Sequence, residues 1–242
     1  MTGVQTCALP ICSFGCTYCY AAFFARDEQL RDNWGYWIHV KENGVRLLQR
    51  MRRSLKGKTI YMSSVTDPYQ PIERKLELVR GLLRELIKHQ PRLVIQTRGP
   101  LVTRDIDLLQ QFEVVQVNMT VTTDSDRIRK AFEPLCPSNR QRLDAIQEIA
   151  AAGITAAITM TPLLPLENPQ RFAEELRATG VQKFVVQPFH IERGKFIRGT
   201  RDEALAIFDE MNWNHEQYEN AVRILRQCLP SLAEGQEGFA PV

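Results

Sequence analysis

The chain has no long hydrophobic run, no internal repeat and little excess charge of either sign. No apolar segment approaches the roughly 20 residues that a helix needs to cross a bilayer, and no secretory signal pattern is visible. We therefore expect a cytoplasmic protein without a membrane partner. The 31 Lys and Arg residues nearly balance the 28 Asp and Glu residues, and the net charge of +3 is too small to indicate nucleic-acid binding.

Histidine and cysteine are also scarce, with four His and six Cys in 242 residues. The histidines form no pair at the spacing of zinc ligands; they are His39, His89, His190 and His215. The irregular cysteine spacing does not fit a disulfide scaffold and favours a reducing compartment. The length and the 44% hydrophobic content suit one α/β barrel-like domain, with two small domains as the less favoured alternative.

Three of the cysteines form a compact motif, C-x3-C-x2-C, made by Cys12, Cys16 and Cys19. This spacing can place three thiolates on three irons of a cubane cluster and leave the fourth iron open to a substrate or cofactor. The competing interpretation is a structural zinc site, or redox use of Cys16 and Cys19. Zinc sites usually have four ligands in pairs, whereas the remaining cysteines are isolated: Cys7, Cys136 and Cys228. The spacing favours the iron–sulfur cluster.

Further blocks accompany the triplet. Tyr20 follows the third cysteine, and the later blocks are Val65-Thr66-Asp67-Pro68-Tyr69-Gln70-Pro71-Ile72-Glu73-Arg74, Thr103-Arg104-Asp105-Ile106-Asp107-Leu108-Leu109, Glu133-Pro134 and Arg142-Leu143. With these blocks the sequence resembles the radical S-adenosylmethionine (SAM) superfamily, and within it the spore photoproduct lyase-like, or DNA repair photolyase-like, family. The resemblance extends from about Cys12 to about Pro188.

The chain divides into three parts. Residues 1–11 resemble the translation of a sequencing adapter, and we expect them to be an artefact that replaces the natural start. Residues 12–190 are the expected radical SAM core domain. Residues 191–242 are the expected C-terminal helical extension, ending in a loose tail from Glu234.

Strand and helix patterns alternate along the core, which predicts an α/β fold with a parallel sheet. Strands are expected at 59–64, 93–97, 114–121, 154–160 and 183–187, and helices at 72–89, 104–112, 138–152, 168–179 and 200–227. A sixth strand is expected before the cysteine motif. The resemblance implies a partial (β/α)6 TIM-type barrel of the radical SAM kind, here N-terminally truncated.

Polar residues follow the predicted strands at their carboxyl ends, where ligands bind in parallel α/β barrels. Each of them alone is better explained as a strand-end cap, but their shared location predicts a cofactor site. The candidates are Ser64, Thr66, Asp67, Thr97, Arg98, Asn118, Thr120 and Thr161. Arg142, in the expected helix over 138–152, is a further candidate that the family resemblance suggests.

The resemblance implies a [4Fe–4S] cluster on Cys12, Cys16 and Cys19, with SAM on the open iron. Arg98 and Arg142 are candidates to bind the SAM carboxylate, with a surface ion pair as the alternative for each. Catalytic roles fall to Tyr18 and Tyr20, which would contact SAM or relay a hydrogen atom; packing beside the cluster is the alternative. A flavodoxin- or ferredoxin-type protein would supply the electron.

The resemblance therefore implies an enzyme that cleaves SAM reductively and abstracts a hydrogen atom from a substrate, with nucleic acid or a modified base as one class. Spore photoproduct lyases carry a cysteine in the loop after the second strand, where this chain has Val65, so we expect another reaction than thymine-dimer repair. Cys136 is a candidate to approach the site in place of that cysteine, but a small buried cysteine is the favoured interpretation. The alternative function is a non-catalytic metal- or cluster-stabilised protein that binds nucleic acid.

Overall fold

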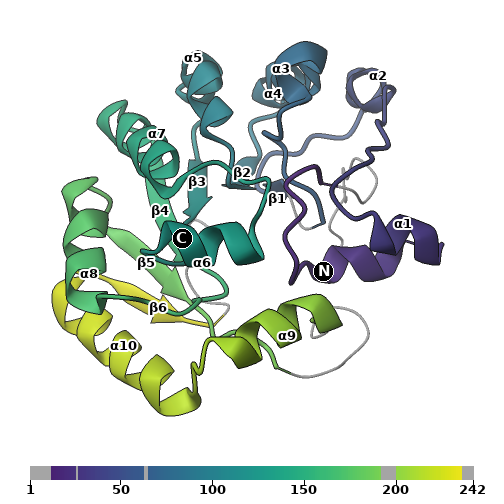
Figure 1. Ribbon diagram of the computed structural model, residues 1–242. Helices are drawn as coiled ribbons and strands as arrows, with labels where there is room; N and C mark the ends of the chain where they lie inside the picture. The colour runs from purple at the N-terminus through teal and green to yellow at the C-terminus, as the bar shows by residue number, and fades with distance from the viewer. Residues whose placement is uncertain (1–11, 26, 63–64, 192–199, 236–242) are drawn as a thin grey trace.

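The computed structural model describes residues 12–25, 27–62, 65–191 and 200–235. Six parallel strands form one sheet in the order β1-β2-β3-β4-β5-β6 (Figure 1). They are β1 (Thr59–Met62), β2 (Arg92–Thr97), β3 (Val115–Thr120), β4 (Thr155–Met160), β5 (Lys183–Val186) and β6 (Leu232–Glu234). Strands that follow one another in both sequence and space, all parallel, are the arrangement of a TIM-type barrel. Because β1 and β6 are the edges of this sheet, the barrel is partial, as predicted.

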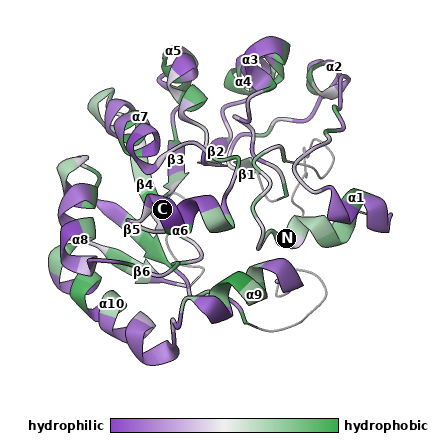
Figure 2. Ribbon diagram, viewed as in Figure 1, coloured by the Kyte–Doolittle hydropathy of each residue, from purple (hydrophilic) through white to green (hydrophobic). Residues whose placement is uncertain are grey.

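Helices surround the outer side of this arc of strands in Figure 1. They are α2 (Gly44–Gln49), α3 (Glu73–Leu76), α4 (Leu78–Ile87), α5 (Ile106–Leu109), α7 (Asn139–Ala151), α8 (Pro169–Ala178) and α10 (His215–Cys228). Hydrophilic and hydrophobic stretches alternate along α7, α8 and α10, as expected for helices with one face on a sheet (Figure 2). The other helices are η1 (Tyr20–Phe24), α1 (Glu28–Asp32), η2 (Pro100–Asp105), α6 (Asp126–Phe132) and α9 (Asp202–Glu210). Within the described ranges, no helix has the length and apolar character needed to span a bilayer.

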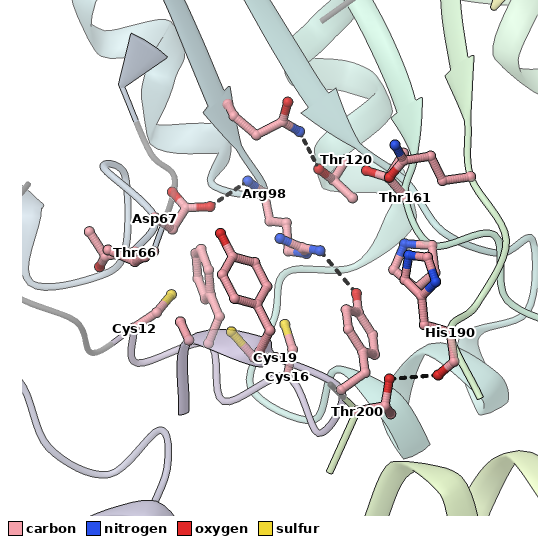
Figure 3. A pocket seen from close by; sticks show the side chains of 18 of the residues that line it. Cys12, Cys16, Cys19, Thr66, Asp67, Arg98, Thr120, Thr161, His190 and Thr200 are labelled. Carbon is pink, nitrogen blue, oxygen red and sulfur yellow. Dashed lines mark hydrogen bonds between the residues drawn. The ribbon is translucent and has the colours of Figure 1, made fainter. Parts of the chain in front are cut away.

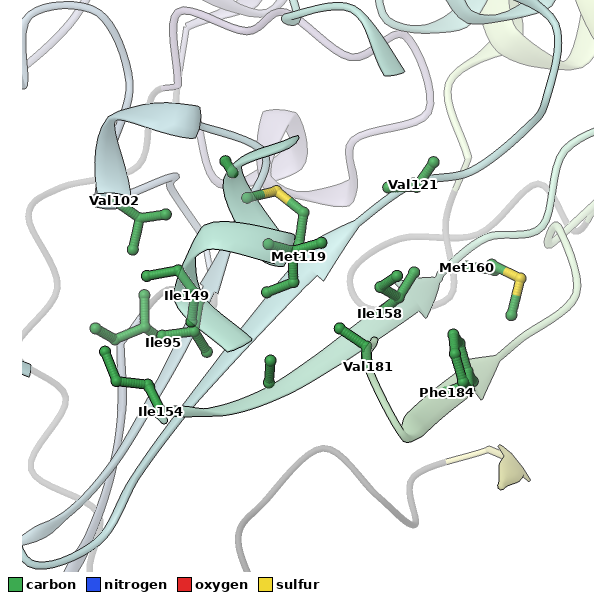
Figure 4. Packing of buried hydrophobic residues seen from close by; sticks show 14 of the residues in the cluster. Ile95, Val102, Met119, Val121, Ile149, Ile154, Ile158, Met160, Val181 and Phe184 are labelled. Carbon is green, nitrogen blue, oxygen red and sulfur yellow. The ribbon is translucent and has the colours of Figure 1, made fainter. Parts of the chain in front are cut away.

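The strands alternate between an apolar outer face and an inner face that carries polar side chains near the carboxyl ends. Ile95, Met119 and Ile158 point outward into the main core beneath the helices (Figure 4). Their neighbours Gln96 and Thr120 belong to the opposite face, toward the inside of the barrel. A polar inner face needs hydrogen-bond partners, and it supplies polar groups to a cavity inside the barrel.

The predicted helix over 72–89 is wrong as one continuous element. The chain breaks at Glu77, whose φ of 48° is left-handed, and forms α3 and α4 instead. The side chain of Glu73 accepts a hydrogen bond from the backbone N–H of Val79 (3.0 Å), which satisfies an amide in the first turn of α4. Helical periodicity continues across such a break, so the sequence pattern did not reveal it.

The predicted long helix over 200–227 also divides, into α9 and α10. Asn212 adopts a left-handed φ of 52°, and Asn214 forms a capping box with Gln217 at the start of α10. The predicted helix over 138–152 is confirmed as α7, and Ser138 caps its start in a capping box with Gln141. Thr200 does not cap α9; its hydroxyl donates to the carbonyl of His190 (2.6 Å).

Five described elements were not predicted: η1, α1, α2, α6 and β6. Ser125 caps the start of α6, and its side chain accepts a hydrogen bond from the N–H of Ile128. Strand β6 pairs with β5 in parallel through Leu232 and Phe184, so the C-terminal part of the chain contributes an edge strand to the sheet. The strand predicted before the cysteine motif, the artefact over 1–11 and Ser64 lie outside the described residues.

Candidate functional site

A cavity of about 560 Å³ lies at the carboxyl ends of the strands (Figure 3). Most of the predicted site residues line it: Cys12, Cys16, Cys19, Tyr18, Tyr20, Thr66, Asp67, Arg98, Thr120 and Thr161. Three predicted residues, Thr97, Asn118 and Arg142, are completely or almost completely buried and do not line the cavity. The cavity also contains groups that were not predicted, among them Trp34, Tyr61, Gln96 and Gln187.

The cysteine loop is fixed by backbone hydrogen bonds. The N–H of Gly15 donates to the carbonyl of Cys12 (3.2 Å), and the N–H of Cys19 donates to the carbonyl of Cys16 (3.1 Å). Both the N–H and the hydroxyl of Thr17 donate to the carbonyl of Phe132, at 2.8 and 3.2 Å, which joins the loop to α6. These bonds hold the loop in place against the barrel.

The three thiols lie on one wall of the cavity, with their sulfurs toward the space below Arg98 and Asp67 (Figure 3). All three cysteines are free thiols. Burial raises the pKa of Cys12 well above its usual value, and burial raises the pKa of Cys19 to about 11. The hydrogen bond with Cys136 is the main cause that lowers the pKa of Cys16, assisted by the positive charge of Arg98.

The donor chemistry of these thiols is compatible with a cubane cluster. Among the described residues, no three His, Cys, Asp or Glu side chains are grouped so that they could hold one metal ion. A cubane does not need such a group, because each thiolate binds a different iron at a separate corner. Three soft sulfur donors at one wall, with free volume in front of them, are the donor set for such a cluster.

A buried carboxylate, Glu133, joins the cysteine loop to the barrel. It forms an ion pair with Arg142, Nη2 to Oε2 2.6 Å, in which both side chains are fully buried. Its other oxygen accepts hydrogen bonds from the hydroxyl of Tyr18, from Arg98 Nε (3.4 Å) and from Thr122 Oγ1 (3.1 Å). Burial raises the pKa of Glu133, but Arg142 and Arg98 outweigh it and bring the pKa down to about 2.

The charges around Glu133 do not cancel, because two guanidinium groups surround one carboxylate. Arg142 also donates to the carbonyls of Pro137 (3.0 Å) and Thr120 (3.1 Å), so it is committed to the protein interior. Arg98 lines the cavity and donates to Tyr18 Oη (2.9 Å). Of the two guanidinium groups, only that of Arg98 faces the cavity, so Arg98 presents the net positive charge there.

Asp67 lies on the same wall as Cys12. It accepts hydrogen bonds from Thr97 Oγ1 (2.6 Å), from the N–H of Arg98 (2.6 Å) and from the N–H of Tyr69 (2.8 Å). Burial raises the pKa of Asp67, and these three donors only partly oppose that effect. Thr97 therefore acts behind the cavity wall, by orienting Asp67.

The inner face of the sheet forms a neutral hydrogen-bond network beneath the cavity. Tyr61 Oη donates to Gln96 Oε1 (2.9 Å), and Gln96 Nε2 donates to Thr120 Oγ1 (2.6 Å) and Thr159 Oγ1 (2.8 Å). The alternation of apolar and polar residues in these strands was the signal that could have identified Gln96 and Thr159. Glu133 lies in a block quoted for the family resemblance, but nothing in its spacing indicated its partners.

The model of the Radical SAM superfamily matches residues 8–178. The chain therefore belongs to the Radical SAM superfamily, as the cysteine motif and the partial barrel indicated. Its radical SAM domain indicates an enzyme of the radical SAM kind.

Individual relatives are similar to this chain over parts of its length. An uncharacterized protein of Methanocaldococcus jannaschii is 38% identical over 154 residues, which are 64% of this chain and 58% of that relative, so the chain spans less than two thirds of its length. A Radical SAM Nalpha-GlyT isomerase of Pseudomonas phage M6 is 24% identical over 180 residues, covering 73% of this chain and 37% of the isomerase.

Among solved structures, a spore photoproduct lyase double mutant with bound AdoMet (SAM) and dinucleoside spore photoproduct has a TM-score of 0.59. It is 16% identical, and the match covers 93% of this chain and 75% of that chain. At this identity the likeness concerns the fold alone, and it confirms the predicted partial barrel.

Proposed function

We propose that this protein holds a [4Fe–4S] cluster on Cys12, Cys16 and Cys19, cleaves SAM reductively and removes a hydrogen atom from a substrate. The observation that carries this proposal is the wall of three free thiols facing a cavity with room for a ligand beside them. When bound, the cluster and SAM supply the radical chemistry, and the protein supplies orientation and exclusion of water.

Arg98 is the proposed partner of the SAM carboxylate. Of the two arginines that pair with Glu133, Arg98 is the one that lines the cavity. A guanidinium binds a carboxylate through two parallel hydrogen bonds. Arg142, which the sequence also suggested, is occupied by Glu133 and by two backbone carbonyls. We assign to Arg142 the role of balancing Glu133, which in turn fixes Arg98.

Thr66 and Asp67 lie beside Cys12 and are the proposed acceptors for the SAM ammonium group. Asp67 is already oriented by three donors, so its position is set before a ligand binds. Thr161 and Pro162 form part of the opposite wall and are the proposed support for the adenine ring. Tyr18 and Tyr20 remain the proposed residues for contact with the radical or for hydrogen-atom relay.

For the substrate we infer a nucleic acid or a modified base. The support is the fold shared with a spore photoproduct lyase whose structure contains a dinucleoside substrate. Val65 lines the cavity at the position where the family resemblance expected a cysteine, which argues against repair of thymine dimers. We also propose a flavodoxin- or ferredoxin-type reductant and, because the described cysteines are free, a reducing compartment such as the cytoplasm.

The test is production of 5′-deoxyadenosine from SAM by the anaerobically reconstituted and reduced protein. We expect product from the wild type and from Cys228→Ala, since Cys228 lies on α10 and does not line the cavity. We expect none from Cys12→Ala, Cys16→Ala or Cys19→Ala. A reconstituted wild type that binds iron but forms no 5′-deoxyadenosine would support the non-catalytic alternative instead.

A further inference from the structure

A fourth cysteine contacts the motif. The sulfur of Cys136 lies 3.6 Å from the sulfur of Cys16, although the two residues are 120 positions apart in sequence. Both side chains are buried, with 8% and 6% of their surface exposed, in a small cluster with Phe14 and Cys12. The distance is within the range of a hydrogen bond between sulfurs.

Cys136 touches Cys16 from behind the cavity wall. Cys12, Cys16 and Cys19 line the cavity, whereas Cys136 does not. A cluster held in that cavity would therefore meet Cys16 directly and would have Cys136 on the far side of the Cys16 sulfur. This placement makes Cys136 a partner of a ligand, and not a ligand itself.

The backbone of Cys136 is held on both sides. Its N–H donates to the carbonyl of Glu133 (3.1 Å), and its own carbonyl accepts from Arg129 Nη1 (3.0 Å). Arg129 is itself buried, with 5% exposed surface. These bonds fix the backbone of Cys136, and its buried side chain places the sulfur beside the cysteine loop.

The thiol of Cys136 has two acceptors within reach. One is Cys16 Sγ at 3.6 Å, and the other is the carbonyl of Phe14 at 3.8 Å. A cysteine that binds iron does so as a thiolate and has no proton to donate, so Cys136 must be the donor of the pair. An ionised acceptor is stronger than a neutral carbonyl, so Cys16 is the favoured partner.

We propose that Cys136 is a positioning residue that donates an S–H···S hydrogen bond to the iron-binding sulfur of Cys16 and raises the reduction potential of the cluster. Hydrogen bonds to cluster sulfurs stabilise the extra negative charge of the reduced form, which makes reduction easier. This inference rests on the proposed cluster. The role that it assigns to Cys136, control of the reduction potential, is separate from the cleavage of SAM.

The test is a redox titration of the anaerobically reconstituted protein, followed by electron paramagnetic resonance of the reduced cluster. Cys136→Ala and Cys136→Val remove the donor, and valine keeps more of the buried volume in case alanine does not fold. We expect both to retain the iron content of the wild type and to shift the midpoint potential to more negative values. Cys136→Ser keeps a donor, so its midpoint potential should lie between that of the wild type and those of the alanine and valine variants. Cys228→Ala is the matched control and should match the wild type.

Each other outcome counts against a specific claim. Equal potentials in the wild type, Cys136→Ala and Cys136→Val would overturn the role of Cys136 and leave the proposed function intact. Folded variants at Cys136 that no longer take up iron would also overturn it, because Cys136 would then be needed to bind the cluster. A wild type without a cluster would overturn the proposed function itself.

Discussion

Glu133 and Arg142 form an ion pair in which neither side chain is exposed to solvent, with Arg142 Nη2 2.6 Å from Glu133 Oε2. The pair connects α7 to the segment after α6, and through Tyr18 and Arg98 it reaches the cysteine loop and the cavity. Loss of one partner leaves a buried charge without its main counterion. The structure therefore makes the stability of the fold and the geometry of the site depend on the same carboxylate.

The first prediction concerns Arg142. Arg142→Met should lower the free energy of unfolding by about 3–5 kcal/mol, because Glu133 would keep its burial and lose its strongest partner. Denaturant titration of the cluster-free protein measures this change. The matched control is Arg140→Met on the same helix, whose pair with Asp144 is exposed and should change stability by less than about 0.5 kcal/mol. Similar values for the two variants would contradict the account.

The second prediction concerns acid stability. Glu133 has a folded-state pKa of about 2, below its value of about 4.3 in an unfolded chain. The unfolded state therefore binds a proton first as the pH falls, and the stabilisation from Glu133 is present above about pH 4.3 and is lost toward about pH 2. Glu133→Gln should be less stable at neutral pH but should lose less stability across this window. Urea titrations at several pH values would show parallel losses in both proteins if Glu133 were not responsible.

The third prediction concerns the cysteine loop. A Cβ at Gly35, which has a φ of 98°, would lie 2.7 Å from the Cα of Gly15 in the loop. Gly35→Ala should displace the loop and reduce the iron bound on reconstitution. The control is Gly57→Ala, which has a similar positive φ of 76° but open space around its Cβ. That variant should show only the backbone penalty of about 1–2 kcal/mol and bind iron normally. Equal iron content in both variants would show that contact with Gly15 does not position the motif.

The fourth prediction concerns two tryptophans. Trp34 lines the cavity, and its buried indole N–H has no hydrogen-bond partner among the described residues. Trp37, in contrast, donates from Nε1 to the carbonyl of Leu30 (2.8 Å). Because solvent does not reach this N–H, Trp34→Phe removes a donor without a partner and should leave the SAM dissociation constant within about twofold of the wild type. Trp37→Phe breaks a hydrogen bond and should lower the free energy of unfolding by about 1 kcal/mol. A fivefold loss of SAM binding in Trp34→Phe would contradict this assignment.

Much of the fold was predictable because its signals are local. The strands around Val94, Val117 and Ile158 are apolar and β-branched, and the start of α7 at Ser138 follows from a capping box. The break at Glu77 was not predictable, since it depends on Glu73, a residue that also pairs with Arg104 from a distant segment. Strand β6 was missed because three residues give too short a pattern to recognise.

The site was predicted where the spacing of residues sets the chemistry, and missed where the fold brings distant residues together. Three cysteines within eight residues predicted a shared location, and all three line the cavity. The partners of Glu133 come from the cysteine loop, β2 and α7, and the contact of Cys136 with Cys16 spans 120 positions. No local pattern encodes such contacts, so Arg142 was assigned to the cofactor and not to Glu133.

The most direct test of the central claim is spectroscopic. Anaerobically reconstituted and reduced protein is examined by electron paramagnetic resonance with and without SAM. We predict a [4Fe–4S] signal that changes when SAM is added, because three protein thiolates leave one iron open to it. A cluster signal that SAM does not alter, or no cluster signal in protein that is folded and loaded with iron and sulfide, would contradict the account.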